Sequence, residues 1–190
     1  MAGETEDIDI PLFGINLGTV GFLTEGEVAN IEEILDRLLT DDFTIEERMM
    51  VTGTVTKADG TTYRKSALND IVISRAGFSR LIGLNVSVDG QVLDTYEADG
   101  VVISTPTGST GYNLSAGGPI VSPDAELLVI TPVSPHSLTA KSIVLSGKEE
   151  ITIEITKKRK TQDTEAICSF DGGNAVSYTH LRAHETDSYL

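Results

Sequence analysis

The sequence lacks several features that would define common protein classes. Among its 190 residues there is one cysteine, Cys168, and no tryptophan. A single cysteine excludes an internal disulfide and any zinc site built from several cysteines. No apolar run approaches the length that spans a membrane. Because the N-terminal segment is acidic, the opposite of a signal peptide, we expect a cytoplasmic protein without membrane partners.

Positive charge is also scarce. The chain carries 14 Lys and Arg against 29 Asp and Glu, a net charge of −15. A surface that binds duplex nucleic acid needs clustered cations, so we expect no nucleic-acid partner. A small phosphorylated ligand is still allowed, because backbone N–H groups can hold an anion without net positive charge. With 39% apolar and 23% charged residues, the composition is that of a folded globular chain.

Three common motifs are missing. The Gly-Lys pair at residues 147–148 is followed by Glu, so it does not complete a G-x-x-x-x-G-K-[ST] phosphate loop. The glycines between residues 14 and 21 do not have the G-x-G-x-x-G spacing. Residues 108–111, Gly-Ser-Thr-Gly, are one residue too short for the G-x-S-x-G hydrolase elbow. P-loop, Rossmann and α/β-hydrolase interpretations therefore fail at the motif level.

Apolar periodicity predicts one helix and a β-rich body. Thr24 and Glu27 have capping-box spacing, and the apolar residues after them predict a helix over roughly 27–39 whose apolar face is core. From about residue 44 the period changes to two, and Asp-Gly pairs at 59–60 and 89–90 predict tight hairpin turns. Further short apolar runs predict strands at 127–131, 142–145, 151–155 and 165–170.

The fold class that we expect is α+β. Residues 1–40 form the remnant of an N-terminal α/β domain, in which 11–23 predict a short buried strand that enters a glycine loop. Residues 41–176 form a β-rich, sandwich-like domain of eight or more strands. Residues 177–190 show no strand alternation and resemble translated sequencing-adaptor read-through, so we exclude them as an artefactual tail. The two histidines of this tail lack a third ligand, and no metal site is predicted there.

A loop rich in glycine and hydroxyl groups follows the predicted strand 101–104. It offers a run of backbone N–H donors and short hydroxyl donors, and Tyr112 adds an aromatic face for a base. This combination suits a nucleotide, although a glycine-rich bulge or wide turn in a sandwich is the plainer alternative. The hydroxyl donors are Thr107, Ser109, Thr110 and Ser115.

The string TPTGSTGYNLSAGGPIVSP, residues 105–123, resembles the signature of the NAD kinases. These enzymes phosphorylate the adenosine ribose 2′-hydroxyl of NAD to make NADP. Other segments agree in order and spacing, so that the resemblance runs from about residue 11 to 174. They are GINLGTVGFL (14–23), LNDIVISR (68–75), ADGVVIS (98–104), TPVSPHSL (131–138) and Asp171-Gly172.

The resemblance implies an NAD pocket made from separate segments. Asn16 and Phe22 lie in the family's glycine loop, which lines this pocket. Asn69 and Asp70 occupy the family's Asn-Glu pair, which holds the adenosine ribose. Asp70 is one methylene shorter than the usual glutamate, and Gly111 stands where alanine is usual. Neither difference argues against NAD binding.

Further contacts are implied in the second half of the chain. The loop from Thr107 to Tyr112 contacts the adenine, against which Tyr112 packs. Asp99 belongs to a segment that in this family reaches the nicotinamide half of NAD across a subunit interface. His136 sits in a loop that helps to close the site, and Asp171 also approaches it.

From the residues alone, plainer alternatives stay open. Asn69-Asp70 can simply open the following strand, although an amide and a carboxylate together favour ribose binding. The Asp-Gly pairs at 99–100 and 171–172 are typical of turns. His136 is typical of a surface loop, and Phe22 is typical of a core.

One family motif is absent. NAD kinases carry Gly-Gly-Asp-Gly-Thr before the GINLG segment; its aspartate is the proposed base and its glycines hold the ATP phosphates. This sequence contains no such string. Phosphoryl transfer depends on positioning and electrostatic stabilisation, so we expect an N-terminally truncated chain that is inactive as given. No catalytic residue and no metal ligand is assigned within it.

The resemblance therefore predicts an ATP-dependent NAD kinase that uses ATP and Mg²⁺, the ion being held mainly by the ATP phosphates. Residues 41–176 are its NAD-binding domain. A catalytically inactive NAD- or adenosine-binding fragment is the first alternative, and a related lipid kinase is the second. A homo-oligomer, dimer or tetramer, is expected, because the family builds its site across subunits.

Overall fold

The computed structural model describes residues 10–17, 26–57, 59–76, 81–156, 166–178 and 180–189, with side chains as far as residue 173. The chain divides into two compact units. The first comprises residues 1–47 with Leu190, and the second comprises residues 48–189.

The first unit contains two short strands and a helix. Strand β1 (Ile15–Asn16) pairs in parallel with β2 (Gly26–Glu27), and a 3₁₀ turn, η2 (Val28–Asn30), leads into helix α1 (Ile31–Leu39). The helix predicted over roughly 27–39 is therefore confirmed. Within the predicted segment 11–23 a short strand is present as β1, but both of its residues are only half-buried, so the expectation that it is buried is wrong. Residues 18–23 of the predicted loop lie outside the described residues.

The apolar face of α1 does not form core in the first unit. Leu35 and Leu39 are 52% and 83% exposed, and no residue of α1 is buried. Ile34 is half-buried beside Gly26. An amphipathic helix buries its apolar stripe only where another element covers it, and no described element of this unit does so. The prediction that this face is core is therefore wrong.

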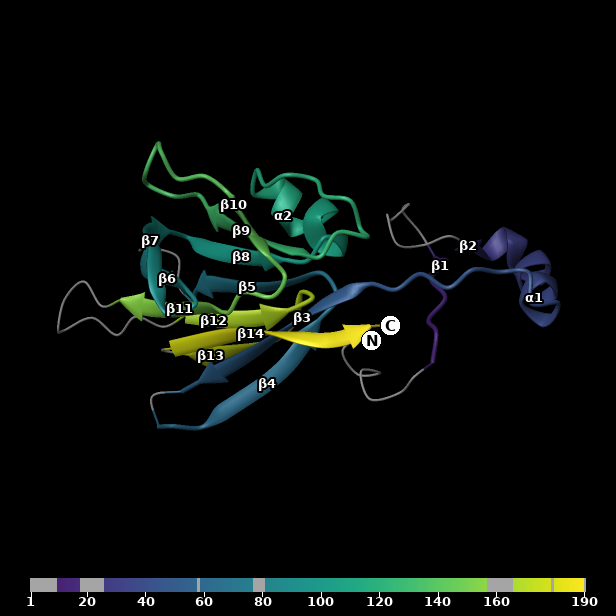
Figure 1. Ribbon diagram of the computed structural model, residues 1–190, viewed down its shortest axis with the longest axis horizontal. Coiled ribbons are helices and arrows are strands. Elements are labelled where there is room, and N and C mark those ends of the chain that lie inside the picture. The colour runs from purple at the N-terminus through teal and green to yellow at the C-terminus, as the bar shows by residue number, and fades with distance from the viewer. Residues whose placement is uncertain are drawn as a thin grey trace. The chain divides into compact units, whose positions relative to one another are not determined.

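The second unit is a sandwich of two antiparallel sheets (Figure 1). The strands of the first sheet are β5 (Asp70–Arg75), β8 (Gly100–Ser104), β9 (Leu127–Val133), β10 (Ile143–Ser146), β12 (Ala166–Phe170) and β13 (Gly173–Tyr178). They are ordered β10-β9-β8-β5-β12-β13.

The second sheet also has six strands, in the order β4-β3-β14-β11-β6-β7. The predicted sandwich-like body of eight or more strands is thus confirmed, and the two sheets hold twelve. The strands of the second sheet are β3 (Met49–Thr56), β4 (Thr62–Ala67), β6 (Ile82–Val88), β7 (Gln91–Ala98), β11 (Ile151–Thr156) and β14 (His180–Tyr189).

Alternating residues of both sheets form one apolar core. Ile71 and Ile73 of β5 lie in it, together with Leu84 of β6 and Ile153 of β11, and all are at most 1% exposed. A buried side chain of this size contributes roughly 1.5–3 kcal/mol. The intervening residues of β5 face away from the core, because side chains alternate along a strand. That outer face carries the site described below.

Both predicted hairpin turns are confirmed. Gly60 lies between β3 and β4 with a φ of 84°. Asp89 and Gly90 lie between β6 and β7 with φ values of 48° and 76°. Two successive residues with positive φ are the geometry of the tight turn that Asp-Gly favours.

The segment excluded as a tail forms a strand. Residues 180–189 make β14, which lies between β3 and β11 and pairs with both. The expectation of no strand there is wrong. Ladder hydrogen bonds join backbone groups, so a strand can complete a sheet without alternating side chains.

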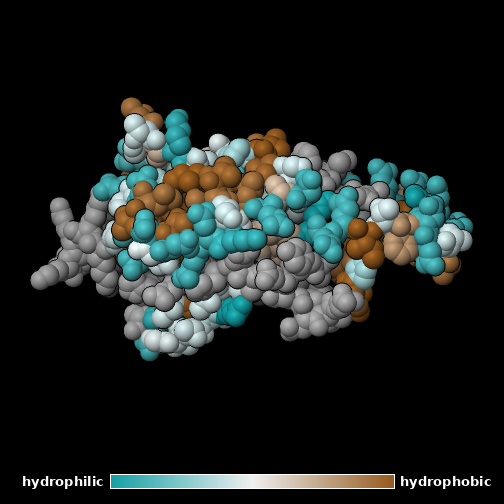
Figure 2. Space-filling view, in the orientation of Figure 1, coloured by the Kyte–Doolittle hydropathy of each residue, from teal (hydrophilic) through white to brown (hydrophobic). Residues whose placement is uncertain are grey.

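The outer face of the first sheet is covered by the glycine-rich loop. This loop forms a 3₁₀ turn, η3 (Thr107–Thr110), and a short helix, α2 (Tyr112–Ser115), which lies above β8 and β9 in Figure 1. Figure 2 shows hydrophobic residues gathered where Figure 1 places β7, β8 and β9. Val92 and Leu93 of β7 are 66% and 40% exposed.

Candidate functional site

Three segments that are far apart in the sequence meet at one end of β5. Asp70, the first residue of β5, is paired with Ser104, the last residue of β8. Ile71 is paired with Phe170, the last residue of β12. The loop that follows β8 and the turn that follows β12 therefore both lie beside residues 68–70 (Figure 1).

The Asp171 carboxylate holds the backbone of residues 68–70. Its Oδ2 accepts the N–H of Leu68 at 2.9 Å, and its Oδ1 accepts the N–H groups of Asn69 and Asp70 at 2.7 and 3.2 Å. The Asp171 N–H in turn donates to the Asp70 carbonyl at 3.0 Å. Asp171 has a φ of 50°, a conformation that aspartate tolerates better than most residues.

Thr105 holds the same turn through its carbonyl groups. Its hydroxyl donates to the Leu68 carbonyl at 2.5 Å, and its N–H donates to the Asn69 carbonyl at 2.9 Å. The hydroxyl also accepts the Gly108 N–H at 3.1 Å, which joins the turn to η3. Residues 68–70 are thus fixed from both sides, and their side chains project from a rigid backbone.

Asp70 is the least satisfied acidic group of this region. It is only 6% exposed, and no described residue donates a hydrogen bond to its carboxylate. Burial, and after it the negative charge of Asp171, together raise the pKa of this carboxyl to about 6. A buried carboxylate without donors is suited to accept hydrogen bonds from a ligand.

The loop after β8 packs directly on this turn. A β-carbon at Gly108 would lie 2.0 Å from the Asn69 carbonyl oxygen, so only glycine allows the approach. Thr107 is 7% exposed, and its hydroxyl has no hydrogen-bond partner among the described residues. A buried hydroxyl without a hydrogen-bond partner destabilises the fold unless a ligand or a water molecule bonds to it.

A buried amide holds the rest of the loop. Asn113 is fully buried, and its Nδ2 donates to the carbonyls of Ser109 and Pro119 at 3.0 and 2.9 Å. Its Oδ1 accepts the Thr131 hydroxyl of β9 at 2.7 Å. The fully buried Ser109 hydroxyl accepts the Val121 N–H at 3.0 Å, so it closes the loop on itself.

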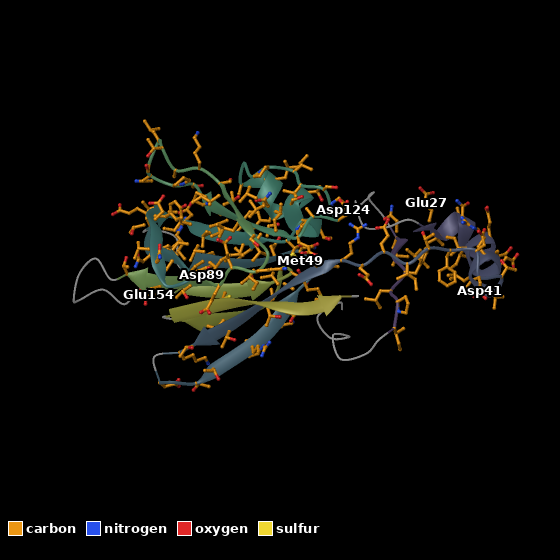
Figure 3. All side chains as sticks on the ribbon, in the orientation of Figure 1. Glu27, Asp41, Met49, Asp89, Asp124 and Glu154 are labelled. Atoms are coloured by element: carbon orange, nitrogen blue, oxygen red, sulfur yellow. The ribbon has the colours of Figure 1, made fainter. Side chains whose placement is uncertain are left out.

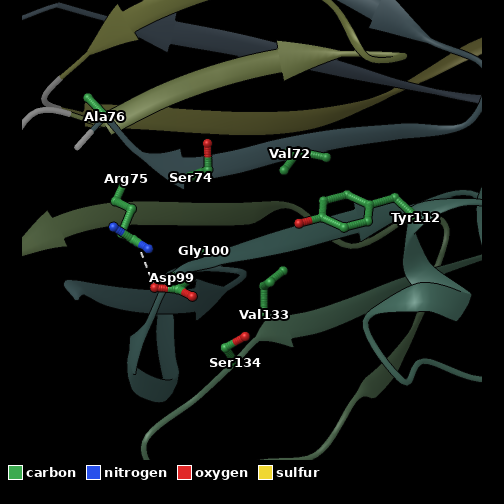
Figure 4. A pocket seen from close by; sticks show the side chains of 9 residues that line it. All are labelled: Val72, Ser74, Arg75, Ala76, Asp99, Gly100, Tyr112, Val133 and Ser134. Carbon is green, nitrogen blue, oxygen red and sulfur yellow. Dashed lines mark hydrogen bonds and ion pairs between the residues drawn. The ribbon is translucent and has the colours of Figure 1, made fainter. Parts of the chain in front are cut away.

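A pocket lies on the outer face of the first sheet, toward the far end of β5 (Figure 4). It has a volume of about 460 Å³, and Tyr112 extends from the loop into it, between Val72 and Val133. Ser74 and Asp70 both lie on the outer face of β5, four residues or about 14 Å apart. The fixed turn and the pocket therefore mark the two ends of one elongated surface.

The far end of the pocket carries an ion pair. Arg75 Nε donates to Asp99 Oδ1 at 2.6 Å, as the dashed line in Figure 4 shows. Both side chains are partly exposed. Ser134, with a φ of 48°, lines the pocket beside them. This end offers charged and hydroxyl groups, whereas the middle offers an aromatic ring and two valines.

Most of the predicted contacts are brought to this surface. Thr110, Gly111 and Ser115 lie in the covering loop, of which Gly111 and Ser115 are exposed. Among the predicted residues, the turn, the covering loop and the pocket together contain Asn69, Asp70, Asp99, Thr107, Ser109, Thr110, Gly111, Tyr112, Ser115 and Asp171.

His136 is not brought there, and two further predicted residues lie outside the second unit or outside the described residues. His136 is exposed, does not line the pocket, and donates its N–H to the Glu97 carbonyl at 2.8 Å. Asn16 is half-buried within the first unit. Phe22 lies outside the described residues.

Sequence reasoning missed three residues with clear structural roles. Thr105 and Asn113 stand inside the quoted loop string, where one amide and one of three threonines gave no signal of burial. Arg75 ends a predicted strand, and nothing near it in the sequence indicates Asp99 as its partner.

Two general features concern metals and membranes. In the ranges that the structure describes, no group of three His, Cys, Asp or Glu side chains could hold a metal ion. Within the same ranges, no helix is long and apolar enough to cross a membrane.

Comparison with known sequences identifies two matching family profiles. The ATP-NAD kinase C-terminal domain matches residues 68–183, and the ATP-NAD kinase N-terminal domain matches residues 1–43. The NAD kinase of Lachnoclostridium phytofermentans is 50% identical over 173 residues, which cover 90% of this chain and 61% of the relative. The NAD kinase of Agathobacter rectalis is 47% identical over 171 residues, 90% of this chain and 59% of the relative.

Two solved structures are similar in fold. Yeast NADH kinase complexed with NADH gives a TM-score of 0.84 at 30% identity, over 91% of this chain and 49% of the other. An NAD kinase from Archaeoglobus fulgidus in complex with ATP gives 0.79 at 29% identity, over 95% of this chain and 67% of the other. The chain spans about three-fifths of the length of the two curated relatives.

Proposed function

Because this chain belongs to the ATP-NAD kinase family, we propose that it provides the NAD-binding part of an NAD kinase. The reaction is transfer of the ATP γ-phosphoryl group to the 2′-hydroxyl of the adenosine ribose, which gives NADP. The observation that carries this proposal is the fixed turn at Asn69 and Asp70, where a buried carboxylate without donors lies beside the loop of Thr107.

The ribose is bound at this turn. Asp70 accepts hydrogen bonds from the ribose hydroxyls, because its carboxylate is ionised at neutral pH and has no donor among the described residues. The Asn69 amide supplies both a donor and an acceptor beside it. A hydroxyl held in this way is oriented for attack, which is the main contribution a protein makes to phosphoryl transfer.

The adenine lies against the loop after β8. The Thr107 hydroxyl supplies a hydrogen bond that no described residue uses, and the Tyr112 ring supplies an aromatic face. Backbone donors and acceptors of η3 complete the contacts. In support, the yeast NADH kinase structure to which this chain is similar was solved with NADH.

The remaining half of NAD extends along β5 into the pocket. The turn at Asp70 and the groups near Ser74 are separated by about 14 Å along the strand, which suits an elongated ligand. Asp99 and Arg75 then lie beside the nicotinamide end. The pocket at 460 Å³ is large enough for part of a dinucleotide but not for a macromolecular partner.

ATP is the phosphoryl donor in this proposal, and the similar Archaeoglobus fulgidus enzyme was solved in complex with ATP. Mg²⁺ would neutralise charge on the phosphates during transfer. The described residues contain no acidic group of three that fits this ion, so we derive no step through it. No residue of this sequence is assigned as the base.

A second candidate is a module that binds NAD without phosphorylating it. The sequence contains no Gly-Gly-Asp-Gly-Thr string, which supplies the base and the phosphate loop in the family. Binding at Asp70 and Thr107 does not depend on that string. Binding and transfer therefore need separate measurements.

We further propose that the protein is a cytoplasmic homo-oligomer. Val92 and Leu93 on β7 are exposed, and a hydrophobic patch lies in this part of the visible face (Figure 2). Exposed patches of this kind favour association, and a closed symmetric assembly is the usual result. Analytical ultracentrifugation should give a dimer or a tetramer, and a monomer at micromolar concentration would contradict this.

Calorimetric titration of the chain with NAD tests the proposal. Asn69→Ala and Asp70→Asn should each weaken binding roughly tenfold or more, because charge-assisted and paired hydrogen bonds contribute about 1.5–3 kcal/mol. The exposed Asp124→Asn is the matched control and should bind as the parent does. Absence of NAD binding by the parent chain would refute the proposal. Incubation with ATP, Mg²⁺ and NAD then distinguishes the two candidates by the presence or absence of NADP.

A further inference from the structure

The backbone of residues 68–70 is held by a single distant side chain. Asp171 accepts all three N–H groups of this turn, although it lies about a hundred residues later in the chain. Both of its carboxylate oxygens are used in this way, and its own N–H is bonded to Asp70. A carboxylate that accepts three N–H groups makes charge-assisted hydrogen bonds, which are stronger than neutral ones.

The arrangement also has an electrostatic cost. Asp171 places a second negative charge beside the buried Asp70, and this like charge disfavours ionisation of Asp70. A neutral residue at position 171 would avoid this repulsion. The carboxylate has one property that a neutral amide lacks, namely two acceptor oxygens for the N–H groups of Leu68 and Asn69.

We infer that Asp171 is a positioning residue: it acts through the backbone of residues 68–70 to set the Asn69 and Asp70 side chains for the ribose, and does not itself hold the ligand. This inference rests on the proposed function, since the ribose is the ligand that the two side chains would orient. It also revises the role that the family resemblance implied for Asp171, from a group approaching NAD to a group holding the residues that do.

Asp171 and Thr105 hold the turn from two sides, and we call this pair of residues the clamp. Asp171 takes the N–H side of the turn, and Thr105 takes the carbonyl side through Leu68 and Asn69. The N–H groups of residues 68–70 and the carbonyls of Leu68 and Asn69 are thus hydrogen-bonded, which restrains the backbone of the turn. A rigid backbone reduces the ordering that a ligand must otherwise impose on Asn69 and Asp70.

The chain offers a matched control for this clamp. Asp89, labelled in Figure 3, also has positive φ, and its Oδ1 also accepts a backbone N–H, that of Glu150 at 2.9 Å. It lies in the β6–β7 turn of the other sheet. Asp89→Asn and Asp171→Asn therefore make the same chemical change at the same kind of backbone position, and only the second is at the proposed site.

The test combines amide hydrogen exchange with NAD titration on the full chain. In Asp171→Asn the side-chain amide faces the Leu68 N–H, so two donors meet and one hydrogen bond is lost. Exchange at residues 68–70 should accelerate at least tenfold, and NAD affinity should fall at least tenfold. Asp171→Glu keeps the charge but displaces it by a methylene, and should give smaller effects in the same direction. Asp89→Asn should change neither quantity more than about twofold.

The pH profile provides a readout that a purely structural role would not change. The negative charge of Asp171 raises the pKa of Asp70, and the Asp171→Asn variant lacks this charge. The raised pKa of Asp70 predicts a midpoint of NAD binding near pH 6 in the parent, and this midpoint should move to lower pH in the variant. The shift is measured relative to each variant's own maximum, so it is independent of the loss of affinity.

Each outcome decides the inference. Unchanged exchange at 68–70 in a folded Asp171→Asn variant shows that the clamp does not hold the turn, and overturns it. Lost NAD affinity with unchanged exchange means that Asp171 touches the ligand directly, which also overturns it. If the parent chain does not bind NAD, the proposed function fails, whereas accelerated exchange in the variant still supports the clamp. If Asp171→Asn does not fold, Asp171→Glu provides the same two measurements.

Discussion

The carbonyl oxygen of Asn69 lies 2.0 Å from the place that a β-carbon of residue 108 would occupy. The two segments that the proposed function assigns to the ribose and the adenine are therefore packed against each other at backbone distance. Gly108 is required by this approach and not by its own φ, since it is absent from the residues with positive φ. The site is consequently sensitive to a single methyl group.

Gly108→Ala should destabilise the protein and abolish NAD binding. The neighbouring atoms are backbone, so the methyl group can be accommodated only by moving the turn or the loop, at about 1–3 kcal/mol. Urea unfolding and calorimetry measure the two effects. Gly173→Ala is the control, because its methyl would meet the Phe170 carbonyl oxygen at an ordinary 3.6 Å. Near-parental NAD affinity in Gly108→Ala would show that the loop can shift without affecting the site.

Asp70→Asn should stabilise the fold while weakening NAD binding. The pKa of Asp70 is raised from 3.8 to about 6 by burial and by Asp171, so its charge is unfavourable in the folded state. The contribution of Asp70 to the free energy of unfolding is fully present below about pH 4, where the carboxyl is protonated in both states. This contribution is lost as the pH rises through about 6, where the folded protein must ionise the buried carboxyl. The variant should therefore gain about 1–3 kcal/mol over the parent at pH 7.5 and little at pH 4. Unfolding at the two pH values measures this difference, and a variant less stable than the parent at pH 7.5 would contradict the prediction.

NAD binding by the parent chain should weaken as pH falls through about 6. The ionised Asp70 carboxylate accepts two hydrogen bonds from hydroxyl groups, whereas its protonated form must donate at one oxygen. Titrations between pH 5 and 8 measure the profile, and Asp70→Asn should lack this step. An identical profile in the variant would assign the step to another group.

Asp99→Asn should weaken NAD binding but not the binding of AMP. Asp99 lies at the far end of the pocket, where the proposal puts the nicotinamide half, and AMP lacks that half. We expect a loss of roughly three- to tenfold for NAD, in part because Arg75 loses its ion pair. Asp70→Asn, the comparison variant, should weaken the binding of both NAD and AMP. Equal losses for NAD and AMP in Asp99→Asn would mean that the pocket is not used as proposed.

Asn113→Ala should cost about 2–4 kcal/mol of stability, because it removes the partner of two carbonyls and one of the two partners of the Thr131 hydroxyl in a buried site. Thermal and urea unfolding measure the loss. Asn85→Ala removes an exposed hydrogen bond to Thr95 and should cost less than about 1 kcal/mol. Similar losses for the two variants would show that the loop is not held by Asn113.

Local sequence patterns predicted the elements that local physics determines. The Asp-Gly turns at 59–60 and 89–90, the change of period near residue 44 and the helix ending at Leu39 all depend on neighbouring residues, and the structure has them. The strands after residue 127 were found for the same reason. The residues themselves indicated the loop after the predicted strand 101–104. The family resemblance added the turn at Asn69 and Asp70, whose contacts no periodicity contains.

What sequence reasoning could not give depends on distant partners. The three hydrogen bonds from residues 68–70 to Asp171 connect positions about a hundred residues apart, and no local pattern records them. The apolar stripe of α1 predicted burial, yet burial requires a covering element that the described part of the first unit lacks. The segment 180–189 was excluded because its side chains do not alternate, although strand pairing is made by the backbone.

The position of β14 has a consequence for the order in which the protein folds. β3 ends at Thr56, and its partner β14 begins at His180, so the second sheet is joined in its middle by a contact of very large sequence separation. Chains whose contacting residues are this far apart in the sequence fold slowly, because the entropy of closing a long loop is lost before the strand pairing contributes any stability. During synthesis β3 and β4 emerge as a hairpin, and β6, β7 and β11 follow as a second group. We expect the two halves of the sheet to join only when β14 pairs with β3 and β11. Refolding from denaturant should therefore show its slowest phase in probes placed on β3 and β11.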